Sequence, residues 1–394
     1  MSGIGWVAVT GTTGARGKAE GRPHLLRVNV AASSPEDLRR ACSDQDINHI
    51  EIYADFSKVT VDEKKRLLEP WCTLDLSVLE SASHLESFAF MSNVRSPGLP
   101  DLRLDLSPLA RHDDLREIVI KGYVEDADLS PLRDCRELRV LSVQMAKTRS
   151  GFAFLSDLRH LSRLELEVTW PKVDFSPAGD CDQLTDVTLS CLQYVDASAL
   201  GSCPKLQTLH IGPLDSIHDS DWSDSVWVRW GGRRYTFGVT LPSSKSLRSL
   251  DLSENYLTYP YWSDPDAAET IGESEQLDLS QLHVCSRLEH INLQMNGLHF
   301  IDLRQMTDIE RVNNMPLPVV DLRNNHLVAV NTEVYAPFEE RILLDDGVVA
   351  TKDDQQVIRE FWNAAEENRL PYPLDQEFIS WLELHWIKGD DTPL

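Results

Sequence analysis

The sequence predicts an α/β solenoid, in which short parallel strands stack into an open sheet and tight turns line the opposite side. Three observations carry this prediction. An apolar motif recurs at a nearly constant step, a proline-containing motif precedes several of its copies, and both ends of the chain lack the repeat. A length of 394 residues would fit two or three average domains, but the repeat favours one elongated array.

The repeated motif has apolar residues at its first, fourth and sixth positions. Its copies are INHIEI from residue 47, LESFAF from 85, LREIVI from 115, LRVLSV from 138, LSRLEL from 161, LTDVTL from 184, LQTLHI from 206, LRSLDL from 247, LEHINL from 288 and LPVVDL from 317. The central starts 115, 138, 161, 184 and 206 give steps of 23, 23, 23 and 22. Because side chains alternate along a strand, each copy predicts a strand with its aliphatic residues turned into a shared core.

A second motif precedes the strands and predicts the turns. It reads DLSPL at 105–109 and 128–132, DFSPA at 174–178, DASAL at 196–200 and DLSQL at 278–282. Proline has the backbone angle of a first helical turn, so this motif predicts a tight helical turn followed by a leucine that closes the core. We expect the strands on a concave face and irregular or 3-10 turns on a convex face.

These repeats resemble the leucine-rich repeat family over residues 46–330, and the short DLSPL units are most similar to those of bacterial internalins. Asn255, Asn296 and Asn325 stand where the family has its consensus asparagine. Earlier repeats carry Tyr123, Ala146 and Thr169 at that offset, so the asparagine ladder should be weaker there. Unlike internalins, the chain shows no export signal and no wall anchor. The resemblance implies a horseshoe that binds other proteins.

The end segments are predicted to cap the solenoid, because terminal repeats expose their core unless something covers it. Residues 1–45 form the predicted N-terminal cap, with strands GWVAV and HLLRVNV and a helix over SPEDLRRAC. Residues 331–394 form a C-terminal helical cap. One helix places Val357, Ile358, Phe361, Trp362 and Ala365 on one face, and a second helix runs from near 373 to 389.

Two steps of the repeat are 41 residues long and predict insertions at about 212–246 and 256–276. The first insertion has alternating runs around Gly231–Gly232, which predicts a β-hairpin. The insertions are rich in aromatic residues and arginine, a composition typical of binding hot spots. The residues we single out are Trp227, Trp230, Arg233, Tyr235 and Trp262. The hairpin could equally bury its own rings, and both interpretations stay open.

Charge and cysteine content limit the partners and the compartment. Acidic residues outnumber basic ones by 63 to 38, which gives a net charge of -25. This negative field disfavours nucleic acid and anionic lipid as partners and favours a basic protein.

The cysteine content bears on the compartment. Seven cysteines without a C-x-x-C pair predict reduced thiols in a cytoplasm. Four of them, Cys135, Cys181, Cys203 and Cys285, share one repeat position and are predicted to be buried fillers rather than a metal or redox pair. No stretch of 18 apolar residues predicts a membrane span.

No motif predicts catalysis, a metal or a cofactor. The stretch GTTGARGKA at 11–19 lacks the first glycine of a phosphate-binding loop, because Thr12 stands there, and Ala19 cannot supply the magnesium-binding hydroxyl. The stretch DSDWSD at 219–224 lacks the glycine and glutamate of a calcium loop. A nucleophile elbow and a zinc-protease motif are also absent.

The outward positions of the strands are the better candidates for function, since solenoids commonly bind on this face. The candidate partner-binding residues there are Tyr53, Lys121, Arg163, Glu165, His210, Asp251, His290 and Asn292. We therefore predict a non-catalytic protein that binds a partner through the concave face and the aromatic insertions. A narrower hypothesis is an inhibitor or immunity-type protein for a basic partner. A hydrolase with a site in the insertions and a purely structural scaffold remain alternatives.

Overall fold

The fold is seen in a computed structural model of the chain. The structure describes residues 4–8, 24–29, 35–42, 47–54, 73–74, 76–82, 84–92, 102–122, 124–145, 151–168, 172–190, 194–212, 238–255, 279–298, 301–306, 309, 316–336, 338–367 and 369. The chain divides into two compact units. Unit 1 comprises Met1–Ser190 and Ser202–Leu206, and unit 2 comprises Cys191–Gly201 and Gln207–Leu394.

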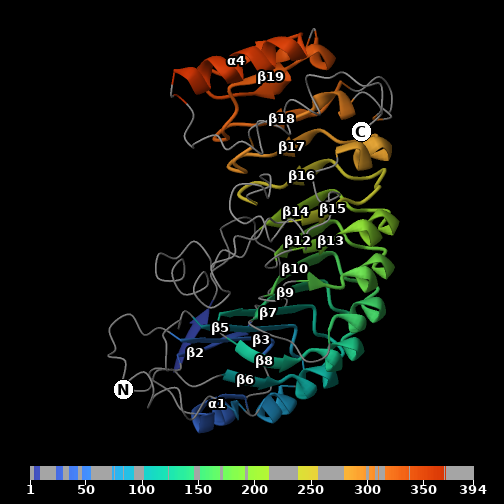
Figure 1. Ribbon diagram of the computed structural model, residues 1–394. Helices are drawn as coiled ribbons and strands as arrows, with labels where there is room; N and C mark the ends of the chain where they lie inside the picture. Colours follow the sequence, from blue (N-terminus) through green and yellow to red (C-terminus); the bar gives the residue numbers. More distant parts are fainter. Residues whose placement is uncertain are drawn as a thin grey trace, which may run out of the picture. The chain divides into compact units, whose positions relative to one another are not determined.

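The main sheet of unit 1 follows the predicted repeat strand by strand (Figure 1). Its order is the chain order: β1 (Ile4–Ala8), β2 (His24–Asn29), β3 (His49–Ala54), β5 (Ser87–Ser92), β7 (Glu117–Gly122), β9 (Val140–Met145), β10 (Arg163–Val168) and β12 (Asp186–Ser190). The strands β1 and β2 pair antiparallel, and β2 pairs parallel with β3. The parallel sheet therefore begins one strand earlier than the repeat suggests.

Unit 2 continues the same construction with shorter strands. Their order is β14 (Thr208–Gly212), β16 (Ser249–Asp251), β17 (His290–Asn292), β18 (Val319–Asp321) and β20 (Ile342–Leu343), all parallel. Each neighbour is the next copy of the motif, so the long steps between repeats do not interrupt the pairing. The strand β20 lies beyond the last recognisable copy, and the sequence analysis did not predict it.

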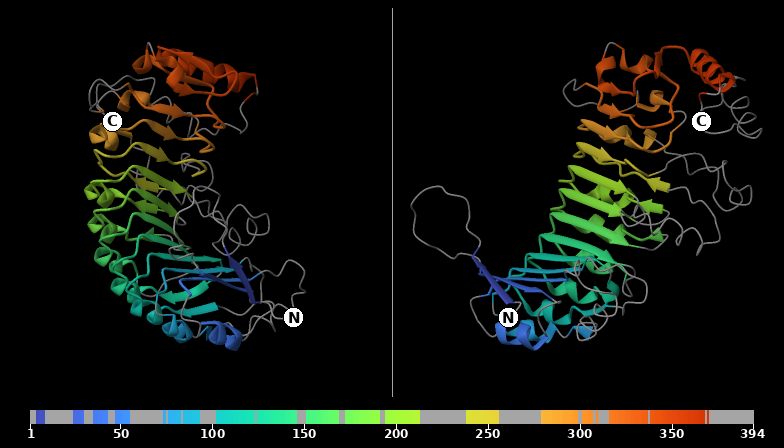
Figure 2. Two further views of the ribbon diagram at one scale, coloured as in Figure 1. Left: turned by 180° about the vertical axis from the view of Figure 1, so that it is seen from behind. Right: turned by 90° about the vertical axis from the view of Figure 1, so that its left-hand side faces the viewer.

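Tight 3-10 turns occupy the side opposite the strands in each unit (Figure 1, Figure 2). They are η2 (Leu76–Ser81), η3 (Ser107–Arg111), η4 (Ser130–Asp134), η5 (Ala153–Asp157), η6 (Ser176–Asp180), η7 (Ser198–Ser202), η10 (Leu279–Val284), η11 (Leu303–Met306), η13 (Glu333–Tyr335) and η14 (Glu339–Arg341). Proline lies in the first turn of η3, η4 and η6. The motif aspartate fixes the bend: Asp105 Oδ1 accepts the backbone N–H of Ser107 at 2.9 Å, and Asp128 does the same for Ser130.

Short second strands precede many turns, and the sequence analysis did not predict them. In unit 1, β4 (Thr73–Leu74), β6 (Leu102–Asp105) and β8 (Val124–Asp128) pair in parallel, and β11 (Lys172–Val173) occupies the same place in its repeat. In unit 2, β13 (Tyr194–Asp196) pairs with β15 (Gly238–Thr240), and β19 (Ala329–Asn331) pairs with β21 (Val349–Thr351). The end of the predicted hairpin at 225–239 thus lies in β15, and the rest of that hairpin lies outside the described residues.

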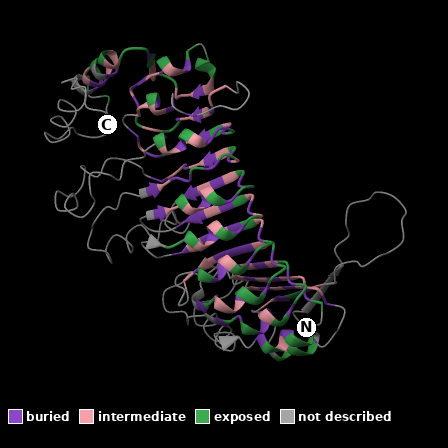
Figure 3. Cartoon of the chain, turned by 90° about the vertical axis from the view of Figure 1, so that its right-hand side faces the viewer, coloured by how far each residue is buried: buried purple, intermediate pink, exposed green. Residues whose placement is uncertain are grey.

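The repeated apolar positions form the core, which appears as buried stripes across the strands (Figure 3). The four repeat-position cysteines are buried and free, as predicted. Each S–H group donates to a carbonyl of the preceding turn; the Sγ–O distance is 3.1 Å from Cys181 to Leu155 and 3.4 Å from Cys203 to Ala178. Cysteine fits this column because it is small, apolar and still able to donate one weak hydrogen bond.

The consensus asparagines form a buried ladder in unit 2. The amide group of Asn296 donates to the Leu252 carbonyl at 2.8 Å, and its Oδ1 accepts the backbone N–H of Asn255 at 2.9 Å. Asn325 repeats this arrangement one rung later, where it accepts from Asn296 and donates to Leu293. The ladder satisfies backbone groups that leave the strands, so it fixes the loop that follows each strand.

The two described helices lie near the ends of the chain. Helix α1 (Pro35–Cys42) packs against η2, and helix α4 (Asp354–Glu366) packs against β19 and β21. Val357 and Phe361 are buried beneath α4, as the predicted apolar face requires, whereas Trp362 is half-buried. The second predicted helix, 373–389, lies outside the described residues. No described helix is long and apolar enough to cross a membrane.

Candidate functional site: the strand face

The candidate site is the outward side of the main sheet, which we call the strand face and describe separately for each unit. Its residues occupy alternate strand positions, so the sheet register stacks them in rows from one repeat to the next. In unit 1 one row aligns Glu51, Ala89, Val119, Ser142 and Glu165. A neighbouring row aligns Tyr53, Met91 and Lys121.

Glu165 is the centre of a polar cluster on the unit 1 strand face. Lys121 Nζ donates to Glu165 Oε1 at 2.9 Å, and Ser142 Oγ donates to Glu165 Oε2 at 2.8 Å. Burial opposes the charge of Glu165, but these two hydrogen bonds outweigh it and lower the pKa of the carboxyl group. Arg163 adds a favourable charge from the same strand. The register thus brings together three predicted site residues, Lys121, Arg163 and Glu165.

Other carboxylates of this face are held in the same way by the preceding strand. Ser87 Oγ donates to Glu117 Oε2 at 2.9 Å, and Gln144 Nε2 donates to Glu167 Oε2 at 2.6 Å. The donors Ser87, Ser142 and Gln144 carry no charge. They therefore orient the carboxylates without adding positive charge, and the cation that pairs with Glu165 is Lys121.

Tyr53 lies in a less charged part of the unit 1 strand face. Its side chain is half-buried, and its row neighbour Met91 is half-buried as well. Arg27 on β2 forms an ion pair with Glu51, with 2.8 Å between Nε and Oε2. Arg27 is not among the predicted site residues, although the alternation of HLLRVNV places it on the same side as Asn29. An apolar centre beside paired charges resembles the composition of binding hot spots.

The strand face of unit 2 brings the remaining predicted strand residues together. His210 Nδ1 lies 3.4 Å from Asp251 Oδ2, and Asp251 Oδ1 accepts from the backbone and the hydroxyl of Ser253. Burial raises the pKa of Asp251, but the bonds from His210 and Ser253 dominate and lower it to about 2. The register aligns Asp251 with Asn292, and His290 occupies the exposed neighbouring row.

The aromatic part of the predicted site is not placed. Trp227, Trp230, Arg233, Tyr235 and Trp262 lie outside the described residues. Their binding role therefore stays a prediction.

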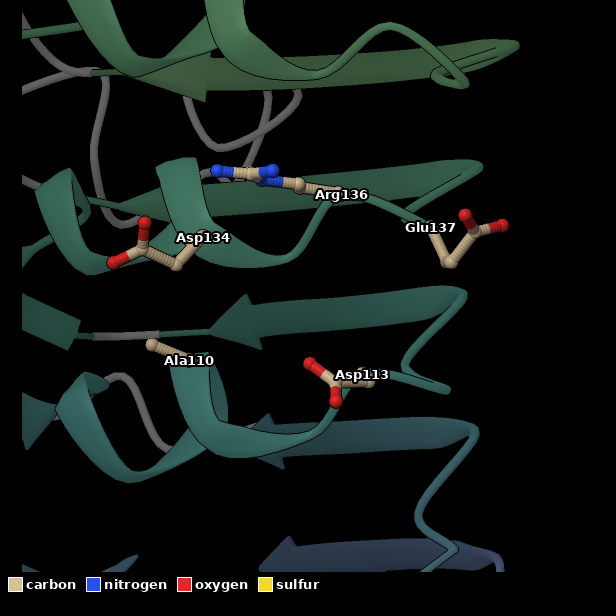
Figure 4. Close-up of a pocket in the computed structure, with 5 residues that line it drawn as sticks. All are labelled: Ala110, Asp113, Asp134, Arg136 and Glu137. Atoms are coloured by element: carbon tan, nitrogen blue, oxygen red, sulfur yellow. The ribbon is translucent and has the colours of Figure 1, made fainter.

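The turn side offers only shallow alternatives in the described part of the chain. One depression of about 410 Å³ is lined by Ala110, Asp113, Asp134, Arg136 and Glu137, which come from two successive repeats (Figure 4). Within the described residues, no group of three histidine, cysteine or acidic side chains is arranged to hold a metal ion. The predicted site residues that the structure describes therefore lie on the strand face of one unit or the other.

The chain matches solved structures of low sequence identity. No protein-family model and no curated protein matches the chain. The plant peptide hormone receptor RGFR1, solved in complex with RGF2, is 11% identical with a TM-score of 0.41 over 79% of this chain and 45% of the receptor. An internalin, InlF, from Listeria monocytogenes is 14% identical with a TM-score of 0.35, covering 82% of each chain. The mouse RP105/MD-1 complex gives 14% identity and a TM-score of 0.42 over 90% of this chain and 64% of that one.

These structures are leucine-rich repeat proteins, the fold that the repeat pattern predicts. The chain spans less than half the length of the plant receptor. At these identities the likeness concerns the fold alone.

Proposed function

We propose that this leucine-rich repeat chain is a non-catalytic binding protein whose strand face receives a protein partner with a basic surface. The observation that carries the proposal is the set of carboxylates in unit 1 that neutral side chains of the preceding strand hold in place. Ser87 holds Glu117, Ser142 holds Glu165, and Gln144 holds Glu167. These bonds order the acidic side chains before any partner arrives, and of the three carboxylates Glu165 is the one that also pairs with Lys121.

Preorganisation explains why such a surface suits lysine and arginine side chains. A carboxylate that is already fixed loses little conformational entropy when a cation approaches it, so more of the attraction appears as affinity. Complementary charge also speeds encounter and discriminates against acidic competitors. The net charge of -25 acts in the same direction over longer distances.

A narrower form of the proposal is an inhibitor or immunity-type role, in which the acidic face masks a basic surface of its partner. The excess of acidic residues supports this form. The proposal also includes a cytoplasmic location. The burial of five free cysteines supports it, because a reducing compartment keeps such thiols unpaired.

The test compares two triple variants with the same change in charge. E117Q/E165Q/E167Q neutralises the strand face, and D113N/D134N/E137Q neutralises the turn-side depression. Proteins captured from the native host are quantified at low and high salt, and circular dichroism checks the folding of both variants. We expect the strand-face variant to lose its main partner by about tenfold, equivalent to roughly 1.4 kcal/mol, and the turn-side variant to retain it. Equal capture by the strand-face variant and the unmodified protein, or a complex indifferent to salt, would refute the proposal.

A further inference from the structure

Met295 combines an exposed apolar side chain with a backbone conformation that methionine adopts at a cost. It lies in the turn that follows β17, and its side chain is 48% exposed. Its backbone φ is 55°, which is the left-handed region. Met295 and Phe338 are the large apolar side chains with this degree of exposure among the described residues.

The backbone conformation is imposed by the repeat and not by methionine. The corresponding residues of the preceding and following repeats, Glu254 and Asn324, have φ values of 63° and 59°. Asparagine visits this region several times more readily than most residues, and methionine does so at a cost. Asn324 therefore suits the position, whereas a methionine there makes the fold less stable than an asparagine or glycine would.

The Met295 side chain contributes little to the core in return. The adjacent Leu293 and Asn296 are fully buried and fill the interior of this repeat. The backbone N–H of Met295 donates to the Arg323 carbonyl at 3.3 Å, a bond that any residue except proline could make. A flexible, polarisable thioether is thus displayed outward at the expense of stability, and methionine is a side chain well suited to binding surfaces.

Three acidic residues belong to the repeats that neighbour Met295 in unit 2. Glu254 precedes it by one repeat, and Asp321 lies in the following repeat, where it accepts hydrogen bonds from Gln294 and from Arg323, the latter at 2.9 Å from Nε. Asp345 Oδ2 accepts the backbone N–H of Asn324 at 2.7 Å. Among the described residues named here, Arg323 pairs with Asp321, and Glu254 and Asp345 add further negative charge. This balance favours a cation beside the apolar contact.

We propose that Met295 is the apolar anchor of a docking site in unit 2 for a protein segment that carries an aliphatic side chain next to a lysine or arginine. The inference rests on the proposed function, that the chain binds a basic protein, and adds a defined contact to it. The aliphatic group packs on the thioether, and the cation meets the carboxylates of Glu254, Asp321 and Asp345.

The site is tested by NMR of the protein labelled with [13C-methyl]methionine. Three methionines serve as reporters: Met295 on the proposed anchor, half-buried Met91 on the unit 1 strand face, and fully buried Met306 as a control for folding. Substitution of each by leucine assigns its signal. The probes are three 12-residue synthetic peptides that alternate leucine with lysine, serine with lysine, or leucine with glutamate.

We expect the leucine–lysine peptide to shift the Met295 signal, while the other two peptides leave it unchanged and Met306 does not respond. A shift at Met91 without a shift at Met295 would overturn the anchor and leave the strand-face proposal standing. A Met295 signal that responds equally to leucine–glutamate would overturn the role of the carboxylates. No shift at either residue would overturn both proposals.

A second variant separates binding from stability. Met295→Asn should raise the melting temperature by about 2 °C, because asparagine tolerates the left-handed backbone. It should weaken the binding of the leucine–lysine peptide, measured by fluorescence anisotropy, by about tenfold. A lower melting temperature would show that the side chain is structural and would contradict the proposal.

Discussion

His112 occupies the repeat position that Cys135, Cys181, Cys203 and Cys285 fill elsewhere. Its side chain is 6% exposed, and its Nε2 atom has no hydrogen-bond partner among the described residues. Burial lowers the pKa of His112, although Glu80, the Ala82 carbonyl and Asp113 partly oppose this effect. The His112 imidazole thus occupies a position where cysteine is the common residue, and one of its two nitrogen atoms lacks a hydrogen bond among the described residues. The folded state disfavours protonation of this imidazole.

The first prediction concerns the pH dependence that His112 causes. A histidine whose pKa is lowered by folding takes up its proton more readily in the unfolded chain. Stability is therefore retained above the unfolded pKa of about 6.5 and falls as the pH drops below it. In His112→Leu this contribution disappears, so the variant should lose less stability between pH 7.5 and pH 5 than the unmodified protein does.

Urea unfolding at pH 7.5 and pH 5 measures this difference. His160→Gln is the control, because His160 is 57% exposed and its loss should leave the pH dependence unchanged. An identical pH dependence in His112→Leu would contradict the prediction.

At the level of single residues, the sequence predicts which side of the sheet a side chain faces better than it predicts which residue that side chain contacts. The alternation of strand positions places Lys121, Glu165 and Asp251 on the outward side, where the structure has them. It does not show that Ser142, also predicted to face outward, is 5% exposed and holds Glu165. Such bonds join residues one repeat apart, and they form only once the register has brought the strands together.

The unit 2 loops depend on the asparagine ladder, which the consensus spacing predicts correctly. Asn296 is fully buried and satisfies backbone groups of two other loop residues, Leu252 and Asn255. The short strands β4, β6 and β8 escaped prediction, since two to five residues carry too little alternation to be recognised. Elements with a long periodic signal are therefore predictable, and elements defined by stacking alone are not.

The second prediction is that Asn296→Ala lowers the free energy of unfolding by about 2 to 3 kcal/mol. The substitution leaves the buried N–H of Asn255 without its acceptor. It also removes one of the two donors to the Leu252 carbonyl, which keeps the hydrogen bond from the Asn255 amide group. Chemical denaturation followed by tryptophan fluorescence measures the change. Asn363→Ala, at an exposed position of α4, should stay within about 0.5 kcal/mol. A loss of similar size in both variants would show that the ladder is not the cause.

At the scale of the whole molecule, the structure describes five of the seven cysteines, and these five are buried and free: Cys42, Cys135, Cys181, Cys203 and Cys285. Burial raises the pKa of the Cys42, Cys135 and Cys181 thiols to about 12 and that of Cys203 to about 11. Because the thiolate is the reactive form, these sulfur atoms should be inert in the folded protein.

The third prediction follows from this count. A folded sample treated with Ellman's reagent at pH 8 should release at most two equivalents of thiol, since seven cysteines less these five leaves two. Addition of guanidinium chloride should then release all seven. More than two equivalents before denaturation would mean that the stacked repeats open readily.

Among the described residues, the last strand of the unit 2 sheet is β20, which is only two residues long. An exposed edge strand has unpaired backbone N–H and C=O groups, so another chain can add a strand to it. A long exposed edge strand is therefore a template for aggregation. A strand of two residues has too few backbone N–H and C=O groups to bind an added strand. Addition of a strand from another molecule at β20 should therefore be unfavourable. Concentrated solutions of the protein should not form fibres through this edge.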